Sequence, residues 1–147
     1  LLGGKGLQKF REMVAAQHGD KAVVDDPSSV LPRPRATVRL LAGASGYVSH
    51  IDALAVGKLA IALGAGRLKS ADRVDHAAGI EFLKKTGERA AKGEPLALLY
   101  ARDAAVARKC AAMLKDAIEY SRTRPRRKPL VLGKVAADGL ERIPSAG

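Results

Sequence analysis

The stretch GAGRLKSADRVDHAAGIEFLKKTGERAAKG, residues 64 to 93, says most about the fold of this chain. Glycines, charges and short apolar runs are interleaved here in an order that neither a plain amphipathic helix nor a solvated linker would produce. Turn signals at Gly87 and Gly93 lie between two runs with strand character, at residues 79–83 and 95–100. The stretch therefore predicts β-rich structure interrupted by turns, and such closely spaced short strands favour a small sandwich.

Two further runs with strand character lie upstream, at residues 37–42 and 47–49, and a glycine-rich turn separates them. This order predicts a hairpin or another pairing of the two strands. Residues 52–63 then switch to Ala, Leu, Val and Ile at helical spacing, with Asp52 as a possible N-cap and Gly64 as the stop. Because this helix is almost entirely apolar, we expect it to be buried.

The N-terminal part of the chain predicts a helix followed by a connector. Apolar residues recur at spacings of three and four between residues 5 and 17, which indicates an amphipathic helix that Gly19 ends. Residues 25–34 contain three prolines, which exclude a regular helix and favour an extended connector. We therefore expect a domain boundary here, with residues 1–34 before it and an α+β domain at residues 35–147.

A second amphipathic helix is predicted after Asp103, which is a suitable N-cap. Its apolar face is predicted to consist of Val106, Cys110, Met113, Leu114, Ala117 and Ile118. A free thiol on an apolar face is far more often buried than reactive, so we interpret Cys110 as a core residue. The apolar run at residues 130–132 could add an edge strand.

Length and composition fit one domain, or a compact domain with an extra flanking piece. The 147 residues are 47% hydrophobic but only 3% aromatic, without Trp, so we expect an aliphatic core with little capacity to stack on nucleobases. The single cysteine excludes an internal disulfide, and no N-terminal segment has the pattern of a secretion signal or a membrane span, which favours a cytoplasmic setting. Since the chain opens with Leu-Leu-Gly-Gly and no Met, we expect it to be cut from a longer polypeptide.

The net charge of +11, from 26 basic and 15 acidic residues, raises a nucleic acid as a partner. Much of the excess is concentrated in residues 122–128, where Pro125 prevents one continuous helical face. We interpret this stretch as a solvated connector. A basic nucleic-acid-binding module is the alternative, and it predicts retention on nucleic acid that weakens steeply with salt. The scarcity of aromatic residues and the absence of an RNA-binding motif argue against it.

Several short motifs occur in one order with sensible gaps along almost the whole chain, at about residues 5 to 137. They are KFREMVAAQ (9–17), SGYV (45–48), IDALAVG (51–57), GAGR (64–67), DHAAGI (75–80), Gly87 and KGEPLA (92–97). Together they resemble the C-terminal third of pyrimidine-nucleoside phosphorylases, including thymidine phosphorylases. Each piece alone is weak, but the ordered set is specific.

The resemblance implies an α+β region whose strands form a barrel-sandwich hybrid, with residues 1–34 belonging to the end of a central α/β domain and its connector. Enzymes of this family cleave pyrimidine nucleosides with inorganic phosphate to the free base and a pentose 1-phosphate, without a cofactor. The family's phosphate loop beginning Lys-His-Ser, and its Arg, Ser and Lys set that grips the pyrimidine, are both missing from the 147 residues. The resemblance therefore implies no catalytic residue in this chain. It implies instead a supporting part of a homodimeric enzyme that also has an N-terminal helical domain.

The glycine-rich loop at residues 64–75 is the most useful feature that the resemblance transfers. The equivalent segment of the family faces the cleft and becomes ordered as the domains close over substrate. We therefore hypothesise that Arg67, Lys69 and Asp72 help to hold the closed state. The alternative is that they are solvated loop residues and that the glycines only make a tight turn.

Other candidate sites have simpler explanations. His18, His50 and His76 have no spacing that would bring two imidazoles onto one helix face, so the sequence predicts no metal site. Asp25 and Asp26 precede Pro-Ser-Ser, which indicates a turn and not an acid–base pair. A biotinyl or lipoyl carrier domain would need an exposed lysine at a hairpin tip between characteristic neighbours, and the Lys-Lys-Thr-Gly run at 84–87 does not provide that setting.

Overall fold

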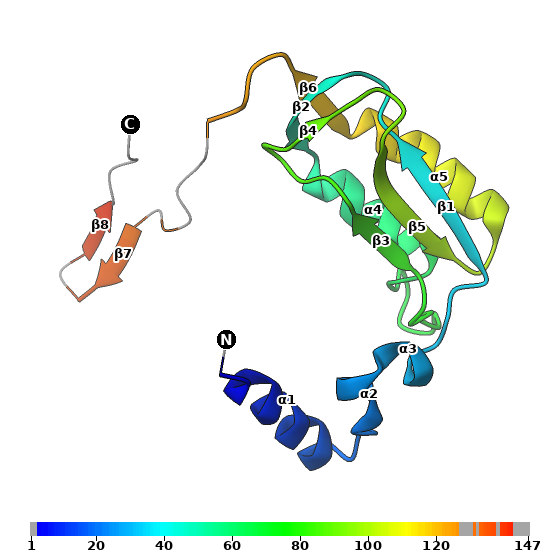
Figure 1. Ribbon diagram of the computed structural model, residues 1–147, viewed down its shortest axis with the longest axis vertical. Helices are drawn as coiled ribbons and strands as arrows, with labels where there is room; N and C mark the ends of the chain where they lie inside the picture. Colours follow the sequence, from blue (N-terminus) through cyan, green and yellow to red (C-terminus); the bar gives the residue numbers. More distant parts are fainter. Residues whose placement is uncertain (1–2, 127–130, 132, 138, 143–147) are drawn as a thin grey trace.

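A computed structural model of the chain describes residues 3–126, 131, 133–137 and 139–142. The elements are α1 (Lys5–Ala16), α2 (Ala22–Asp25), α3 (Pro27–Val30), β1 (Ala36–Leu41), β2 (Gly46–Ile51), α4 (Ala53–Leu63), β3 (Gly79–Phe82), β4 (Arg89–Ala90), β5 (Pro95–Ala101), α5 (Ala104–Asp116), β6 (Ile118–Ser121), β7 (Gly133–Ala136) and β8 (Gly139–Arg142). Helices and antiparallel strands are mixed, so the α+β class is confirmed (Figure 1).

The strands of the described residues form small open sheets. One has the order β1-β5-β3, a second has the order β4-β2-β6, and β7 pairs with β8. The predicted strands at 37–42 and 47–49 are therefore present, but the pairing between them is wrong, because β1 joins β5 and β2 joins β4 and β6. Backbone hydrogen bonds from Ala42 N to Glu94 O (2.8 Å) and from Gly93 N to Ala42 O (2.8 Å) hold the end of β1 beside the turn before β5. The chain then continues from β1 into β2, which belongs to the other sheet.

The helix after β5 supplies much of the core. Asp103 is its N-cap as predicted, with Oδ1 accepting from Ala105 N at 2.6 Å. The predicted apolar face is wrong in part, because the buried residues of α5 are Ala107, Cys110, Ala111 and Leu114. Val106 and Met113 are exposed, and Ile118 already belongs to β6. The buried set follows the i, i+3, i+4, i+7 pattern, which lies in one narrow stripe, and its small alanines let the helix approach the sheet closely.

The helix α4 begins and ends where the sequence predicts. Asp52 Oδ1 accepts from Leu54 N (2.9 Å) and Ala55 N (3.1 Å), and Gly64 ends the helix with a φ of 108°. The expectation that the whole helix is buried is wrong, since Leu54 is 67% exposed and the buried residues are Leu59 and Leu63. Only one side of α4 packs on α5 and the sheet, so an apolar composition does not by itself bury the other side.

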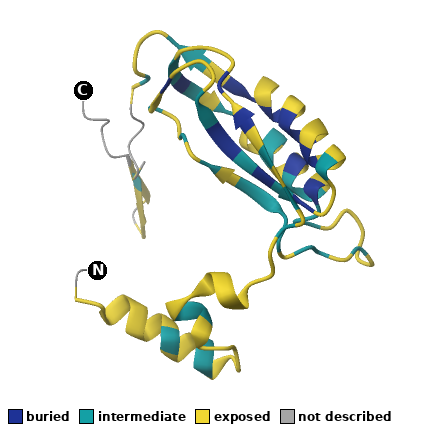
Figure 2. Cartoon of the chain, turned by 45° about the vertical axis from the view of Figure 1, so that its right-hand side comes forward, coloured by how far each residue is buried: buried dark blue, intermediate teal, exposed yellow. Residues whose placement is uncertain are grey.

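The proline-containing segment 25–34 also differs from its prediction as a wholly extended connector. Pro27 begins α3, and Asp26 caps this single turn by accepting from Ser28 N at 3.0 Å. A proline is compatible with the first helical position because the N–H it lacks has no partner there anyway. The strands β1–β6 and the helices α4 and α5 form the main body of the molecule. In Figures 1 and 2, α1, α2 and α3 lie below this body, and none of their residues is buried.

The edge strand expected at 130–132 falls mainly outside the described residues. Within the described part of the chain, no helix combines the length and the apolar character that crossing a lipid bilayer requires.

We predict that Leu114→Ala lowers the free energy of unfolding by about 2 to 5 kcal/mol, because Leu114 is fully buried and its removal leaves a cavity under α5. Urea denaturation followed by circular dichroism measures this change. The matched control is Met113→Ala, where the side chain is 54% exposed and the cost should stay below about 1 kcal/mol. Equal losses for the two variants would contradict the observed helix face.

Candidate functional site

The segment that connects α4 to β3, residues 64–78, is the candidate site and is called the 64–78 loop below. It begins where α4 stops, with Gly64 N donating to Ile61 O and Ala65 N donating to Ala60 O, both at 2.9 Å. A Cβ on Gly66 would lie 2.7 Å from Ile61 Cγ1, so only glycine lets the chain pass this close to the helix. In Figure 1 the loop is the green trace at the lower end of the body, near α3.

Asp75 closes the base of the 64–78 loop. Its backbone N donates to Gly64 O at 2.8 Å, and its Oδ1 accepts from Ala77 N at 3.0 Å. Arg102, directly after β5, places its Nε 3.5 Å from Asp75 Oδ2. The Arg102 side chain is largely exposed, so this ion pair contributes little stability, but it ties the loop to the end of the central strand of the first sheet.

Asp72 organises the tip of the same loop. Its Oδ2 accepts from Leu68 N (3.0 Å) and Lys69 N (2.8 Å), and its own N donates to Lys69 O at 3.0 Å. The carboxylate thus satisfies two backbone donors of the turn in the manner of an aspartate-stabilised turn. The sequence hypothesis grouped Asp72 with the residues that hold a closed state. In the structure, its carboxylate stabilises the turn by accepting from Leu68 N and Lys69 N.

Arg67 and Lys69, the other two predicted residues, are exposed at the tip of the loop. Neither makes a hydrogen bond or ion pair through its side chain with the described part of the chain. Leu68 between them is 82% exposed. The tip therefore presents two cations and one apolar side chain outward on a backbone that Asp72 stabilises. The role of Arg67, Lys69 and Asp72 in domain closure stays a prediction.

Sequence reasoning did not identify Asp75 and Arg102 as the base of the loop. The run Asp-His-Ala before a strand is compatible with the turn that Asp75 forms with Ala77, so Asp75 had a local signal. Arg102 had none, because its partner lies 27 residues earlier and only the pairing of β3 with β5 brings the two together.

Groups that could carry chemistry do not converge within the described residues. No three His, Cys, Asp or Glu residues there could hold a metal ion. Cys110 is buried, as the sequence predicts, and burial raises the pKa of its thiol, which keeps it protonated. Tyr100 donates its hydroxyl to Glu81 Oε2 at 2.5 Å, and this bond raises the pKa of Tyr100. Both effects favour the neutral, unreactive form.

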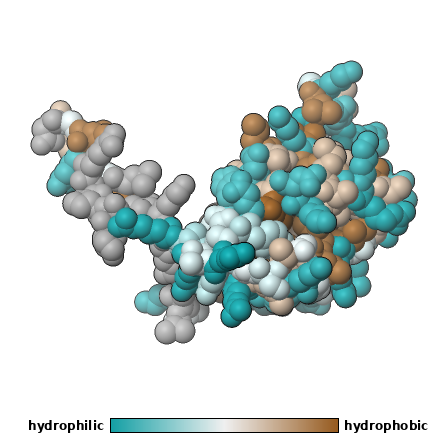
Figure 3. Space-filling model, turned by 90° about the horizontal axis from the view of Figure 1, so that it is seen from above, coloured by the Kyte–Doolittle hydropathy of each residue, from teal (hydrophilic) through white to brown (hydrophobic). Residues whose placement is uncertain are grey.

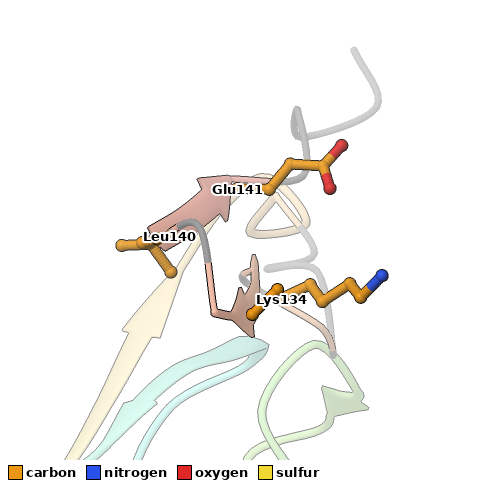
Figure 4. A pocket seen from close by; sticks show the side chains of 5 residues that line it. Lys134, Leu140 and Glu141 are labelled. Carbon is orange, nitrogen blue, oxygen red and sulfur yellow. The ribbon is translucent and has the colours of Figure 1, made fainter.

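A hollow on the hairpin of β7 and β8 is lined by Lys134, Ala136, Gly139, Leu140 and Glu141. Lys134 and Glu141 face each other in the register of the hairpin, and Figure 4 shows their side chains extending away from Leu140. The neighbouring Val135 and Leu140 are themselves mostly exposed. The described residues of this hollow include no set of groups suited to catalysis, so we interpret it as a feature of the hairpin surface.

Comparisons with known proteins match the body of the structure. Residues 47–121 match the family model described as "Pyrimidine nucleoside phosphorylase C-terminal domain". The "Pyrimidine-nucleoside phosphorylase" of Bacillus subtilis (strain 168) is 45% identical over 98 residues, which are 67% of this chain and 22% of the relative. That of Geobacillus stearothermophilus is 46% identical over 97 residues, 66% of this chain and 22% of the relative.

A third relative carries a different name. The "Thymidine phosphorylase" of Burkholderia lata (strain ATCC 17760 / DSM 23089 / LMG 22485 / NCIMB 9086 / R18194 / 383) is 38% identical over 104 residues, 71% of this chain and 24% of the relative. The chain thus spans less than a quarter of the length of each of these three relatives.

We predict that Asp72→Ala loosens the tip of the 64–78 loop while the rest of the fold persists. The amides of Leu68 and Lys69 lose their acceptor, so their hydrogen exchange should accelerate on the order of fivefold to tenfold. Exchange measured by NMR tests this. Lys69→Ala is the control, because it keeps the backbone bond to Asp72; faster exchange in the control, or unchanged exchange in Asp72→Ala, would show that the carboxylate does not hold the turn.

Proposed function

The chain belongs to the pyrimidine nucleoside phosphorylase C-terminal domain family, and from this premise we propose that it is the C-terminal region of an enzyme that cleaves pyrimidine nucleosides with phosphate to the free base and a pentose 1-phosphate. The observation that carries the proposal is the family match over residues 47–121, which covers the body of the fold from β2 to β6. Relatives named as pyrimidine-nucleoside and thymidine phosphorylases support it.

Within that enzyme, this chain is a supporting lobe and the catalytic groups lie elsewhere. Phosphorolysis needs a phosphate held against the anomeric carbon and fixed donors for the negative charge that develops on the departing base. The described residues offer neither a phosphate loop at a helix start nor converging ionisable groups. Their buried residues are apolar, which suits a structural role.

The proposal also assigns the parts of this chain to domains of the enzyme. We propose that the strands belong to the barrel-sandwich hybrid of the family, although the sheets of the described residues are small and open. In the same proposal, residues 1–34 are the end of the central α/β domain with its connector. Leu7, Phe10 and Met13 support this placement, because they repeat every three residues along α1 and are about half exposed. In the enzyme that apolar side of α1 would be covered by the rest of the central domain. The enzyme is cytoplasmic and dimerises through its N-terminal helical domain.

The 64–78 loop has a gating role in this proposal. Arg67 and Lys69 are exposed cations at its tip, suited to pair with groups across a cleft when the domains close. Asp72 acts through them, by holding the turn from which they extend. Asp75 and Arg102 hold the base of the loop while the tip moves.

We expect that this chain restores activity when it replaces the corresponding C-terminal region of the Bacillus subtilis relative. The chimera should release uracil from uridine and phosphate at a rate within about tenfold of that relative, because a supporting lobe affects positioning and not chemistry. Absorbance of the released base measures the rate. The relative truncated before this region, and the 147-residue chain alone, are the controls and should both be inactive. Base release by the chain alone, or a folded but inactive chimera, would contradict the proposal.

In the active chimera, Arg67→Ala should lower kcat/KM about tenfold, because a closure contact is lost while the catalytic groups remain. Steady-state phosphorolysis at varied uridine concentration measures the effect. Arg108→Ala is the matched control: Arg108 is an exposed arginine of α5, remote in sequence from the loop, and its removal should leave the kinetics unchanged. Unchanged turnover and affinity in Arg67→Ala would remove the gating role of this residue.

A further inference from the structure

A second hollow, of about 370 Å³, opens at the end of the body where β2, β4 and β6 meet, and its lining consists of Ser45, Gly46, Tyr47, Arg89 and Arg122. Figure 1 places these strands at the end of the body opposite α3, so the hollow is far from the 64–78 loop. Figure 3 looks down on this end of the body, where teal hydrophilic side chains border a paler surface. We call this feature the arginine hollow.

The second sheet brings the two arginines together. Tyr47 of β2 is the register partner of Arg89 in β4 on one side and of Ser121 in β6 on the other. Arg122 directly follows the last residue of β6, and it lines the hollow together with Tyr47 and Arg89. The arrangement arises from pairing between segments that are about 40 to 75 residues apart in the chain.

The backbone around the arginine hollow is held in place by several bonds. Ser45 Oγ accepts from Lys92 N at 2.9 Å, which joins the turn before β2 to the turn after β4. Val48 N donates to Glu88 O at 2.9 Å, and Ser121 Oγ donates to Thr123 O at 2.6 Å. A Cβ on Gly46 would lie 2.7 Å from Ser121 O, so glycine permits the close approach of β2 to β6. The walls are therefore preorganised, which lowers the entropic cost of binding.

The charge of the hollow is unbalanced. Among the described residues that line it, none is acidic. Neither Arg89 nor Arg122 makes a hydrogen bond or ion pair with its side chain in the part of the chain that the structure describes. Nearby Glu88 directs Oε2 to Lys85 N at 2.7 Å, which occupies that carboxylate within its own turn. Two guanidinium groups without a partner in the described residues thus line the same hollow as Ser45 and Tyr47. Guanidinium groups are well suited to bind phosphate oxygens through paired N–H donors.

From this geometry we propose that the arginine hollow binds a small phosphate monoester, with its phosphate between Arg89 and Arg122 and its organic part against the ring of Tyr47. The volume of the hollow lies in the range of small-molecule pockets. A half-buried tyrosine at its wall provides an apolar surface for a planar or sugar group. The proposal does not depend on the phosphorylase assignment, because every residue in it belongs to the second sheet and its turns.

The test uses the 147-residue chain and three probes, namely AMP, adenosine and inorganic phosphate, with titrations followed by calorimetry and by amide chemical shifts. AMP should bind most tightly, inorganic phosphate more weakly, and adenosine weakest, with shifts centred on residues 45–47 and 89. Arg89→Gln and Arg122→Gln should each weaken AMP binding about tenfold, the effect of one lost charge-assisted contact. Tyr47→Leu should weaken AMP binding but leave inorganic phosphate unchanged.

The control for net charge is Arg108→Gln, which removes one exposed arginine of α5, outside the lining of the hollow. AMP affinity within about twofold of the unmodified chain in this control supports a specific site. An equal loss in Arg108→Gln and Arg89→Gln overturns it, since the binding would then follow total charge. Adenosine binding as tight as AMP overturns the phosphate contact. Oligoadenylates of increasing length are a further probe. If their affinity rises steadily with length and far exceeds that of AMP, the ligand is a nucleic acid and the proposal of a small-molecule site is wrong.

Both arginine variants change exposed residues, so folding is checked by the thermal unfolding midpoint of each variant. A variant that keeps the midpoint and loses AMP binding supports the proposal. A variant that keeps both overturns it.

Discussion

The packing of α5 against the sheet formed by β1, β5 and β3 is the interaction on which the rest of the structure depends. Leu96 and Leu99 of β5 and Leu114 of α5 are the largest fully buried side chains of these elements, and each contributes about 1.5 to 3 kcal/mol when it leaves water. The strand β5 pairs on both sides, so a change in it disturbs both neighbours. Because only 3% of the residues are aromatic, aliphatic side chains must supply most of the apolar surface that this core buries.

Aspartate side chains define where the elements begin and how the loops turn. Their carboxylates accept backbone N–H groups over two to four residues at Asp26, Asp52, Asp72, Asp75 and Asp103. These local bonds satisfy donors at helix starts and turns that have no partner in the helix or sheet. Some basic residues still pair with acidic groups, as Arg11 does with Asp25 and Arg102 with Asp75. The exposed cations Arg67 and Lys69 form no such pair in the described part of the chain. The net charge of +11 is the excess of 26 basic over 15 acidic residues.

The two ends of the body differ in what they present. At one end, the 64–78 loop extends exposed cations on a turn that short-range bonds hold, anchored to β5 through Asp75 and Arg102. At the other end, residues of β2 and β4 and of the turns beside them line the arginine hollow. Among the described residues, those buried between the two ends are all apolar, so no network of buried polar side chains connects them. We therefore expect changes at one end to have little effect on the other. A supporting lobe of a larger enzyme with a separate ligand site is compatible with this arrangement.

The sequence alone determined the features that depend on interactions between residues close together in the chain. The caps Asp52 and Asp103, the stop at Gly64, the turns at Gly87 and Gly93 and the α+β class could all be read from it, because each depends on backbone donors and φ angles within a few residues. The positions of Arg67, Lys69 and Asp72 in one loop were likewise visible. Only the tertiary structure decided that β1 pairs with β5 and not with β2, that Met113 lies outside the core, that Arg102 meets Asp75, and that Arg89 and Arg122 line one hollow with Tyr47. These features depend on which distant segments share a sheet, and pairing across 40 or more residues leaves no periodic trace in the local sequence.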